Sequence, residues 1–395
     1  MVIKNLLDRS KSIFENDFLS MKDRISKEVR QSTFVIVGGA GTIGSSVVKL
    51  LVSLKSKNIH VVDISENNLV ELIRDIRSSN NEIVTEIKTY AMDCGSQEFL
   101  KFLTDQPSID YLLNFSALKH VRSERNVYTL KRLIDVNIIN SVKLLDLAVS
   151  KGCKKYFCVS TDKATNPTSM MGASKLLMEK IILSQKSTLK VSTARFANVA
   201  FSDGSLLFGF EHRLKKKQPL AIPVDIKRFF VTQEEAGQLC VLSCVLADDK
   251  EIFFPQTSKT FGDISLIDIT SKFLQERGFE PAPFDDENMA RNSVDKCVAQ
   301  GKWPCFYFKS DTTGEKPFEE FYAKNEKVSF DDFDTIGKIK FDVGASNVDY
   351  NSFIQSYDNF KKGKNWKKSD LVGIFKRFLP NFLHEERHKN LDQKM

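Results

Sequence analysis

Three adjacent side chains, Thr161, Asp162 and Lys163, bring a hydroxyl, a carboxylic acid and an amine together. They follow Tyr156–Ser160, an aromatic and apolar run that predicts a buried strand. Ligands of α/β proteins bind at the carboxyl ends of such strands, so an acid and a base placed here would face a substrate. The alternative is a solvated turn with no chemical role.

A glycine-rich turn earlier in the chain is typical of a phosphate site. The spacing G-x-x-G-x-x-G stands between a β-branched run and an apolar-periodic helix. Glycines there permit a tight turn and let a pyrophosphate approach the N–H groups of the helix N-terminus. The alternative is a glycine-rich turn that binds nothing. The expected cofactor contacts are Gly38, Gly41, Thr42, Ile43 and Gly44.

Two acids follow the next predicted strands. Asp63 ends the strand-like run Ile59–Asp63, nineteen residues after Gly44. A carboxylate at this point accepts hydrogen bonds from a ribose 2′-hydroxyl and repels a 2′-phosphate, so it favours NAD over NADP. Asp93 is a candidate for contact with the adenine, with an exposed turn acid as the alternative. The glycine turn and Asp63 together predict bound NAD.

The elements that must position these groups alternate between strand and helix from residue 33 onward. Short β-branched runs predict strands, and longer stretches with helical periodicity separate them. This alternation predicts an α/β fold, a Rossmann-type doubly wound parallel sheet with a smaller mixed α/β substrate-binding lobe. Strands are expected at 33–37, 59–63, 83–92, 111–115, 156–160 and 190–196, and helices at 43–55, 67–77, 128–150 and 169–186.

The alternation weakens after about residue 200, where the smaller lobe is expected to lie over the carboxyl edge of the sheet. Segments 210–217, 233–246 and 266–276 have helical periodicity, whereas the proline-containing segments 218–223 and 280–284 are predicted as loops. The expected domains are an N-terminal helical arm (1–32), an NAD-binding Rossmann domain (33–205), an interleaved substrate-binding lobe (206–345) and a basic C-terminal tail (346–395).

Both chain ends carry apolar residues at helical spacing. The stripe of the arm has no obvious place in one Rossmann core, so we expect a homo-oligomer, with packing onto the chain's own lobe as the alternative. Residues 361–395 hold ten Lys or Arg and four Asp or Glu, and therefore +6 of the formal net charge of +7. Their apolar stripe at 371–382 predicts a docking element outside the fold that contacts anionic membranes; a solvated or oligomer-packing helix is the alternative.

The composition excludes several classes of protein. Of 395 residues, 42% are hydrophobic and 28% charged, as in ordinary soluble globular proteins. The near-neutral charge before residue 361 argues against a nucleic-acid binder. Seven cysteines without C-x-x-C and five histidines without ligand spacing disfavour disulfides and metal sites. The sequence offers neither an apolar span nor a signal segment, so we expect a cytoplasmic protein.

The three-residue glycine spacing resembles that of the extended short-chain dehydrogenase/reductase family. That family usually carries Tyr-x-x-x-Lys on a later helix, where this sequence has Met171 and Lys175. A thioether cannot transfer a proton, so Met171 at this catalytic position separates the chain from ordinary dehydrogenases and 4-epimerases, which need the phenol.

The stretch Ser160–Lys175, S-T-D-K-A-T-N-P-T-S-M-M-G-A-S-K, is similar to the UDP-N-acetylglucosamine 4,6-dehydratases of bacterial polysaccharide synthesis. In that family Thr-Asp-Lys carries the elimination, and Met at the Tyr position is a known variant. The resemblance implies that Lys163 is the base at sugar C5 and Asp162 the acid at C6. It also implies that Thr161 holds the C4 hydroxyl and Lys175 the nicotinamide ribose. Which group removes the C4 hydroxyl proton stays open.

Other segments resemble the same family in chain order, from about residue 33 to 325. Segment 114–121 resembles A-A-L-K-H-V, 195–199 resembles R-F/Y-G-N-V, 228–232 resembles R-Y/F-F-M-T, and 314–320 resembles R-P-G-E-K without its Arg. For Lys119 and His120 the alternatives are a surface charge and a packed histidine. The resemblance implies cofactor contacts at Ser116 and Ala117 and substrate contacts at Lys119, His120, Asn198, Ser205, Arg228 and Glu315.

The resemblance implies an NAD-dependent hydro-lyase that converts a nucleotide-linked N-acetylglucosamine, with UDP as the expected nucleotide, to a 4-keto-6-deoxy sugar. Oxidation at C4 and reduction at C6 cancel, so NAD is retained. One alternative is a nucleotide-sugar 4-epimerase or reductase, against which Met171 weighs. Another is a catalytically inactive NAD-binding protein, against which the Asp162–Lys163 pair weighs.

Overall fold

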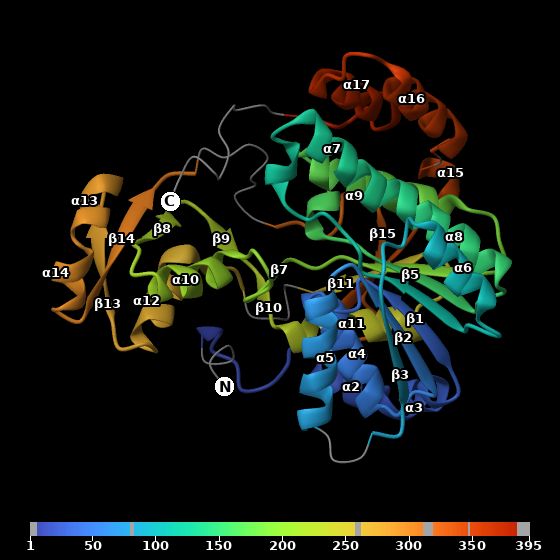
Figure 1. The fold of residues 1–395 in the computed structure, drawn as a ribbon, viewed down its shortest axis with the longest axis horizontal. Helices are drawn as coiled ribbons and strands as arrows, with labels where there is room; N and C mark the ends of the chain where they lie inside the picture. The colour runs from blue at the N-terminus through green and yellow to red at the C-terminus, as the bar shows by residue number, and fades with distance from the viewer. Residues whose placement is uncertain (1–5, 80–82, 257–261, 311–318, 347, 385–395) are drawn as a thin grey trace.

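A nine-stranded sheet lies at the centre of the larger body (Figure 1). The computed structural model describes residues 6–79, 83–256, 262–310, 319–346 and 348–384. The strands of this sheet are β1 (Thr33–Val37), β2 (Asn58–Asp63), β3 (Glu86–Ala91), β4 (Tyr111–Asn114), β5 (Lys155–Val159), β6 (Lys190–Ala194), β11 (Glu251–Pro255), β15 (Lys327–Ser329) and β16 (Ile336–Lys340).

The strand order is that of a doubly wound fold. It runs β15-β16-β11-β6-β5-β4-β1-β2-β3, and all pairs from β11 to β3 are parallel. Strands β15 and β16 pair antiparallel at one edge. The order reverses between β1 and β4, and α/β folds bind ligands at such a switch point. The predicted Rossmann-type α/β fold is confirmed.

Helices cover both faces of this sheet (Figure 1). Small or apolar residues face the strands, and capping residues such as Ser96 and Ser169 begin several of the helices. A π-helical turn, η2 (Asp135–Ile139), joins two helices where one long helix is predicted. The helices are α4 (Thr42–Ser53), α5 (Glu66–Ser79) and α11 (Gln233–Leu246) on one face, and α6 (Gln97–Asp105), α7 (Val127–Ile134), α8 (Asn140–Ser150) and α9 (Met170–Ser184) on the other.

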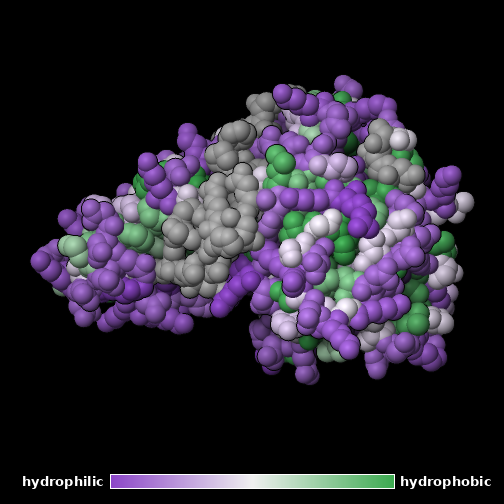
Figure 2. Space-filling model, turned by 90° about the horizontal axis from the view of Figure 1, so that it is seen from above, coloured by the Kyte–Doolittle hydropathy of each residue, from purple (hydrophilic) through white to green (hydrophobic). Residues whose placement is uncertain are grey.

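A narrower lobe projects from this body (Figures 1 and 2). Its core packs helices against a parallel three-stranded sheet ordered β13-β14-β8. The prediction of loops at 218–223 and 280–284 is wrong, because the strands β8 and β13 lie in these segments. Both are edge strands, where a proline removes no required ladder hydrogen bond. The elements are α10 (Leu206–Lys215), β8 (Leu220–Pro223), α12 (Leu266–Gln275), β13 (Glu280–Phe284), α13 (Glu287–Asn292), α14 (Val294–Val298) and β14 (Lys302–Phe308).

The two parts are interleaved along the chain. Strands β11, β15 and β16 and helix α11 come from segment 206–345, yet they belong to the larger body. Two short pairs lie between the parts: β7 (Asn198–Val199) runs parallel to β10 (Phe230–Val231), and β9 (Lys227–Arg228) runs antiparallel to β12 (Ile264–Ser265). The chain therefore crosses between body and lobe several times.

The N-terminal arm packs on its own chain. Helices α2 (Glu15–Ser20) and α3 (Lys22–Arg30) bury Phe18, Ile25 and Val29 in the main core, whereas Leu6 and Leu7 join the core of the lobe. Only Leu6 and Leu7 follow the alternative weighed for the arm, which was packing onto the chain's own lobe, since the arm's helices pack on the main body. Both contacts bury the stripe and remove it as a reason for oligomerisation. A homo-oligomer stays a prediction, to be checked by light scattering.

The C-terminal tail up to residue 384 is also part of the fold, so the expectation that it lies outside is wrong for these residues. Helices α16 (Tyr350–Lys362) and α17 (Lys368–Phe378) cover α9 and α7 (Figure 1). Leu371, Phe375 and Phe382 of the apolar stripe are buried in the main core, because the stripe faces α9 and not solvent. Within the described residues, no helix is both long and apolar enough to cross a bilayer.

Candidate active site

A cavity of about 690 Å³ opens at the carboxyl ends of the strands, beside the switch point. Its walls come from the glycine turn, the loop after β4, the turn after β5, the start of α9 and the loop after β7. The structure brings together sixteen of the predicted residues: Gly38, Gly41, Thr42, Ile43, Gly44, Ala117, Lys119, His120, Thr161, Asp162, Lys163, Met171, Lys175, Asn198, Ser205 and Arg228.

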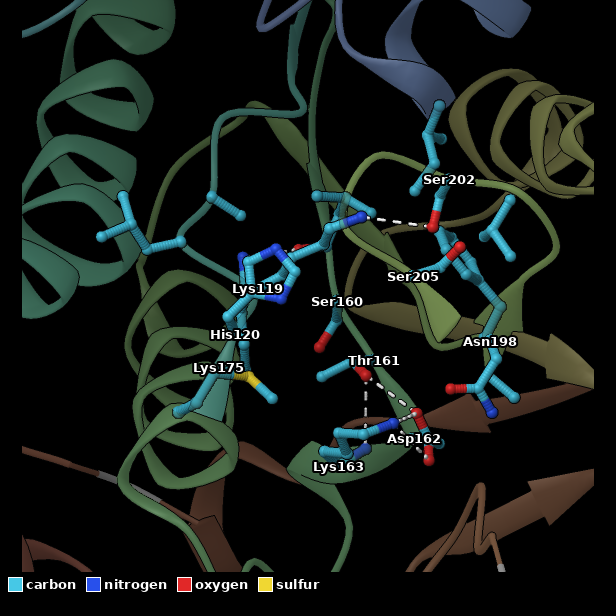
Figure 3. Close-up of a pocket in the computed structure, with 18 of the residues that line it drawn as sticks. Lys119, His120, Ser160, Thr161, Asp162, Lys163, Lys175, Asn198, Ser202 and Ser205 are labelled. Carbon is cyan, nitrogen blue, oxygen red and sulfur yellow. Dashed lines mark hydrogen bonds and ion pairs between the residues drawn. The ribbon is translucent and has the colours of Figure 1, made fainter. Parts of the chain in front are cut away.

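The groups predicted for acid–base chemistry form one hydrogen-bonded cluster (Figure 3). The Thr161 hydroxyl donates to Asp162 Oδ1 at 2.8 Å, and the Lys163 amine lies 3.1 and 3.3 Å from the two oxygens of that carboxylate. Asp162 is 5% exposed and Lys163 36%. The carboxylate thus accepts a hydroxyl and an ammonium at once, so the resting cluster is an ion pair facing the cavity.

Helix α9 approaches this cluster closely because of one glycine. A Cβ atom at Gly172 would lie 2.3 Å from the carbonyl oxygen of Lys163. The Ser169 hydroxyl accepts the Gly172 N–H at 3.1 Å and so begins the helix at this point. The first turns of α9 therefore press Met171 and Lys175 against the catalytic turn. Met171 is buried and lines the cavity where the resemblance expects a phenol.

Lys175 is a buried residue of the cavity wall. It donates to the carbonyl oxygen of Val159 at 3.1 Å. Burial lowers its pKa, while the nearby Cys158 and Glu179 act in the opposite direction. The contact fixes the amine at the end of β5, from which it can hold a cofactor hydroxyl.

A buried charge network supports the same wall from behind. Glu179 on α9 accepts the Ser160 hydroxyl at 2.5 Å and binds Arg195 at 2.7 Å. Arg195 also binds Glu326 at 2.8 Å. Both Arg195 and Glu179 are 1% exposed. The network ties α9, the end of β6 and the residue next to Thr161 into one rigid unit.

The opposite wall carries two basic groups in unusual surroundings. The Lys119 amine donates to the Ser202 hydroxyl at 3.2 Å (Figure 3). The wall around that amine lowers its pKa by desolvation, which Asp203 partly offsets. The pKa of His120 is lowered by burial and by the positive charges of Lys119 and Arg122. Both side chains line the cavity and favour their neutral forms more than free side chains do.

Sequence reasoning missed a carboxyl group in this cavity, that of Glu319. It accepts a short hydrogen bond from the Asn198 side-chain amide and another from the Phe229 N–H at 2.6 Å, and it lies 3.9 Å from Arg228. Burial and the charge of Asp162 raise its pKa to about 8, against the effect of Lys163. Nothing in the sequence distinguishes Glu319 from Glu320, so only the fold identifies it.

The glycine turn fits a pyrophosphate. Gly38 has a φ of +70°, and a Cβ there would lie 2.7 Å from the backbone nitrogen of Ser116. Gly41 precedes α4 without a side-chain cap, so the first N–H groups of that helix are available to an anion. The Thr42 hydroxyl donates to Asp203 at 3.1 Å and joins the turn to the loop after β7.

The remaining predicted cofactor contacts are not in the cavity wall. Asp63 lies beside the glycine turn and accepts the N–H groups of Ala40 and Ser65 at 3.1 and 2.9 Å, which leaves carboxylate lone pairs for a ribose. Asp93 binds Arg132 at 3.0 Å. The pKa of Asp93 is lowered, chiefly by the hydrogen bond that its carboxylate accepts from the Gly95 N–H. The Ser116 hydroxyl donates to Asn114 at 2.6 Å.

Glu315, which was predicted as a substrate contact, lies outside the residues that the structure describes.

Comparisons with known proteins show which family the chain belongs to. A family model described as polysaccharide biosynthesis protein matches residues 34–340. An uncharacterized membrane protein of Methanocaldococcus jannaschii is 28% identical over 89% of this chain and 97% of its own. A UDP-N-acetylglucosamine 4,6-dehydratase (inverting) of Campylobacter jejuni is 26% identical over 56% of this chain and 66% of its own. The chain spans about half, 47%, of a probable polysaccharide biosynthesis protein of Bacillus subtilis, at 25% identity.

Solved structures share the fold. Pen from Bacillus thuringiensis has a TM-score of 0.65 at 24% identity and covers 80% of this chain and 91% of its own. The dTDP-glucose 4,6-dehydratase DesIV from Streptomyces venezuelae, solved with NAD, has a TM-score of 0.55 at 17% identity over 73% and 88%. A UDP-N-acetylglucosamine 4-epimerase from Methanobrevibacter ruminantium also has a TM-score of 0.55, at 16% identity over 75% and 91%.

Proposed function

The chain belongs to the polysaccharide biosynthesis protein family, and from that premise we propose that it is an NAD-dependent nucleotide-sugar 4,6-dehydratase. Its proposed substrate is UDP-N-acetylglucosamine, and its product is the 4-keto-6-deoxy sugar. One observation carries the proposal: an intact Thr161–Asp162–Lys163 cluster faces the cavity where Met171 replaces the usual proton-transferring phenol. A similarity to the Campylobacter jejuni dehydratase supports it.

The residues present fit NAD. The uncapped start of α4 and the cradle at Gly38 suit a pyrophosphate, Asp63 suits an unphosphorylated ribose, and Lys175 suits the nicotinamide ribose. When bound, NAD supplies acceptance of hydride from sugar C4 and its return at C6. The protein's own part is to bind the sugar and to move protons at C4, C5 and C6.

The Thr161–Asp162 contact gives the C4 proton a route. A C4 hydroxyl bound at Thr161 passes its proton through the Thr161 hydroxyl to Asp162, 2.8 Å away. Asp162 then becomes a carboxylic acid that protonates the C6 hydroxyl, which leaves as water. The carboxylate returns to its starting state, so this proton moves from one substrate oxygen to another.

Lys163 completes the proton balance. Protonation of Asp162 removes the negative charge, 3.1 Å away, that favours the Lys163 ammonium, and the amine is open enough to release a proton to water. The neutral amine takes the C5 proton as the C6–oxygen bond breaks. It returns a proton to C5 when hydride reaches C6 and then takes back from water the proton that it released at the start, so Lys163 ends as the ammonium of the resting ion pair.

Product analysis tests the proposal. The purified protein is incubated with UDP-N-acetylglucosamine, and NMR identifies the product. A dehydratase gives a 4-keto-6-deoxy sugar that carries deuterium at C6 when the substrate is deuterated at C4, and deuterium at C5 when the solvent is heavy water. Formation of UDP-N-acetylgalactosamine alone identifies a 4-epimerase, the alternative that the structurally similar epimerase represents.

A further inference from the structure

The end of the described chain returns to the active-site helix. After α17, Leu379 and Phe382 are buried in the main core. His384 follows them, and its side chain is 5% exposed. His384 Nε2 lies 3.5 Å from Glu124 Oε2, and Glu124 is 4% exposed. Among the residues that the structure describes, neither of these two atoms has a hydrogen-bond partner within normal geometry. The two atoms nevertheless lie within the distance of an ion pair.

Glu124 connects this histidine to the cavity. It ends η1 (Val121–Glu124), the turn that follows Lys119 and His120. Its other oxygen, Oε1, accepts the backbone N–H of Met171 at 2.9 Å. That N–H belongs to the first turn of α9, which has no earlier helical carbonyl to pair with. One carboxylate thus touches the tail on one side and the start of the active-site helix on the other.

The tail helices hold the same region by a second route. The Tyr357 hydroxyl on α16 donates to Asp135 at 2.7 Å, at the beginning of the π-helical turn. Asn137 in that turn donates to the Leu118 carbonyl at 3.1 Å and to the Ser174 hydroxyl at 3.0 Å. Leu118 and Ser174 precede the cavity residues Lys119 and Lys175. The tail therefore supports the loop after β4 and helix α9, two of the elements that line the cavity.

We propose that His384 is a positioning residue of the active site. It gives the buried Glu124 carboxylate the partner that keeps Oε1 on the Met171 N–H, and so fixes the first turn of α9. Without His384, Glu124 Oε2 is a buried carboxylate oxygen that turns toward solvent or toward another donor, and its hold on α9 weakens. The inference rests on the proposed function only in taking this cavity as the active site.

Hydrogen exchange tests the proposal without turnover. In the full-length protein, His384→Ala is expected to raise amide exchange in the segment 170–175 about tenfold or more, because the Met171 hydrogen bond opens more often. His384→Gln retains a side-chain N–H donor and is expected to restore slow exchange. Leu383→Ala, at an exposed neighbouring position, is the control. Unchanged exchange in His384→Ala overturns the proposal.

Kinetics and a double variant separate positioning from simple loss of stability. His384→Ala is expected to lower kcat for UDP-N-acetylglucosamine about ten- to a hundredfold with KM within twofold, and His384→Gln to recover most of it. In a Glu124→Ala background, His384→Ala is expected to add no further loss. Equal impairment by Ala and Gln, or additive losses, contradicts the proposal. A wild-type protein inactive on this substrate contradicts the proposed function alone, since the exchange result stands by itself.

Discussion

The two walls of the cavity are built differently. The wall formed by the turn after β5 and by α9 is cross-linked behind the surface by Ser160, Glu179 and Arg195, all buried. The wall formed by the loop after β7 touches the rest of the site through exposed or half-buried contacts, such as Lys119 with Ser202 and Thr42 with Asp203. The first wall is rigid before substrate arrives, whereas the contacts of the second can be exchanged for contacts with a ligand. Under the proposed function, we therefore expect the first wall to fix the catalytic geometry and the second to adapt to the substrate.

The largest effect is expected on the rigid wall itself. Lys163→Ala removes the base for C5, so turnover is expected to fall about 10²–10⁴-fold, as for loss of one acid–base group. Deuterium entry at C5 from heavy water, followed by NMR, is expected to disappear as well. NAD content after denaturation of the purified variant should equal that of the wild type. Near-normal turnover would refute the assigned role and make Lys119 the next candidate.

Breaking the support behind that wall comes next. Arg195→Met leaves Glu179 buried without its cation, so the free energy of unfolding is expected to fall by about 3–5 kcal/mol. Urea denaturation measures the change. Arg291→Met, which breaks the exposed pair with Glu287, is the matched control and is expected to cost under about 1 kcal/mol. Similar losses in both variants would show that the buried network does not make this wall rigid.

The carboxyl group of Glu319, which binds Asn198 just before the second wall, gives the next test. The pKa of Glu319 is raised from 4.5 to about 8, so the folded protein holds this proton more tightly than the unfolded chain. The resulting stability is present below pH 4.5 and is lost as the pH rises through 8. Relative to Glu319→Gln, the wild type is therefore expected to lose melting temperature between pH 5 and pH 8.5. Glu320→Gln is the control, and a pH-independent difference would contradict the assignment.

The smallest effect is expected from substitutions of exposed tail lysines, which lie far from both walls of the cavity. The tail's apolar stripe is buried, but Lys361, Lys364, Lys367 and Lys376 are exposed. Binding to anionic vesicles is therefore expected to be ionic only, about 1 kcal/mol per lysine near the membrane surface, and to vanish at high salt. Co-sedimentation with anionic vesicles measures this binding, and the wild type is compared with a variant that carries glutamine at these four positions. Salt-resistant binding, or equal binding to neutral vesicles, would contradict this picture.

Local patterns predicted the fold because they depend on local physics. The run Thr33–Val37 has a strand pattern and is followed by glycines, of which Gly38 adopts the positive φ that favours glycine. Tyr156–Ser160 has a strand pattern too and is followed by the polar residues of the turn 161–163. The sixteen predicted residues in one cavity follow from the parallel sheet, which places all such turns at one edge.

The failures came from features that depend on distant partners. Pro281 and Pro283 predict a loop from the sequence alone. They are compatible with β13 because β14 pairs with only one side of this strand. The apolar stripe at 371–382 was predicted to be exposed, because the helix that covers it, α9, lies about 200 residues earlier in the sequence. Glu319 acquires its role from Asn198, Phe229 and Arg228, none of which is near it in sequence. Burial by long-range contact leaves no local signature.

The buried pair between Arg9 and Glu235 has a consequence for the order in which the chain folds. Its partners are 226 residues apart, and the Arg9 side chain also donates to the Phe230 carbonyl at 2.8 Å. The arm is synthesised before α11, so its binding surface on that helix does not exist when the arm is made. Leu7 packs in the core of the lobe and Phe14 in the main core, so the docked arm contacts both parts. We therefore expect the arm to dock only after α11 has formed.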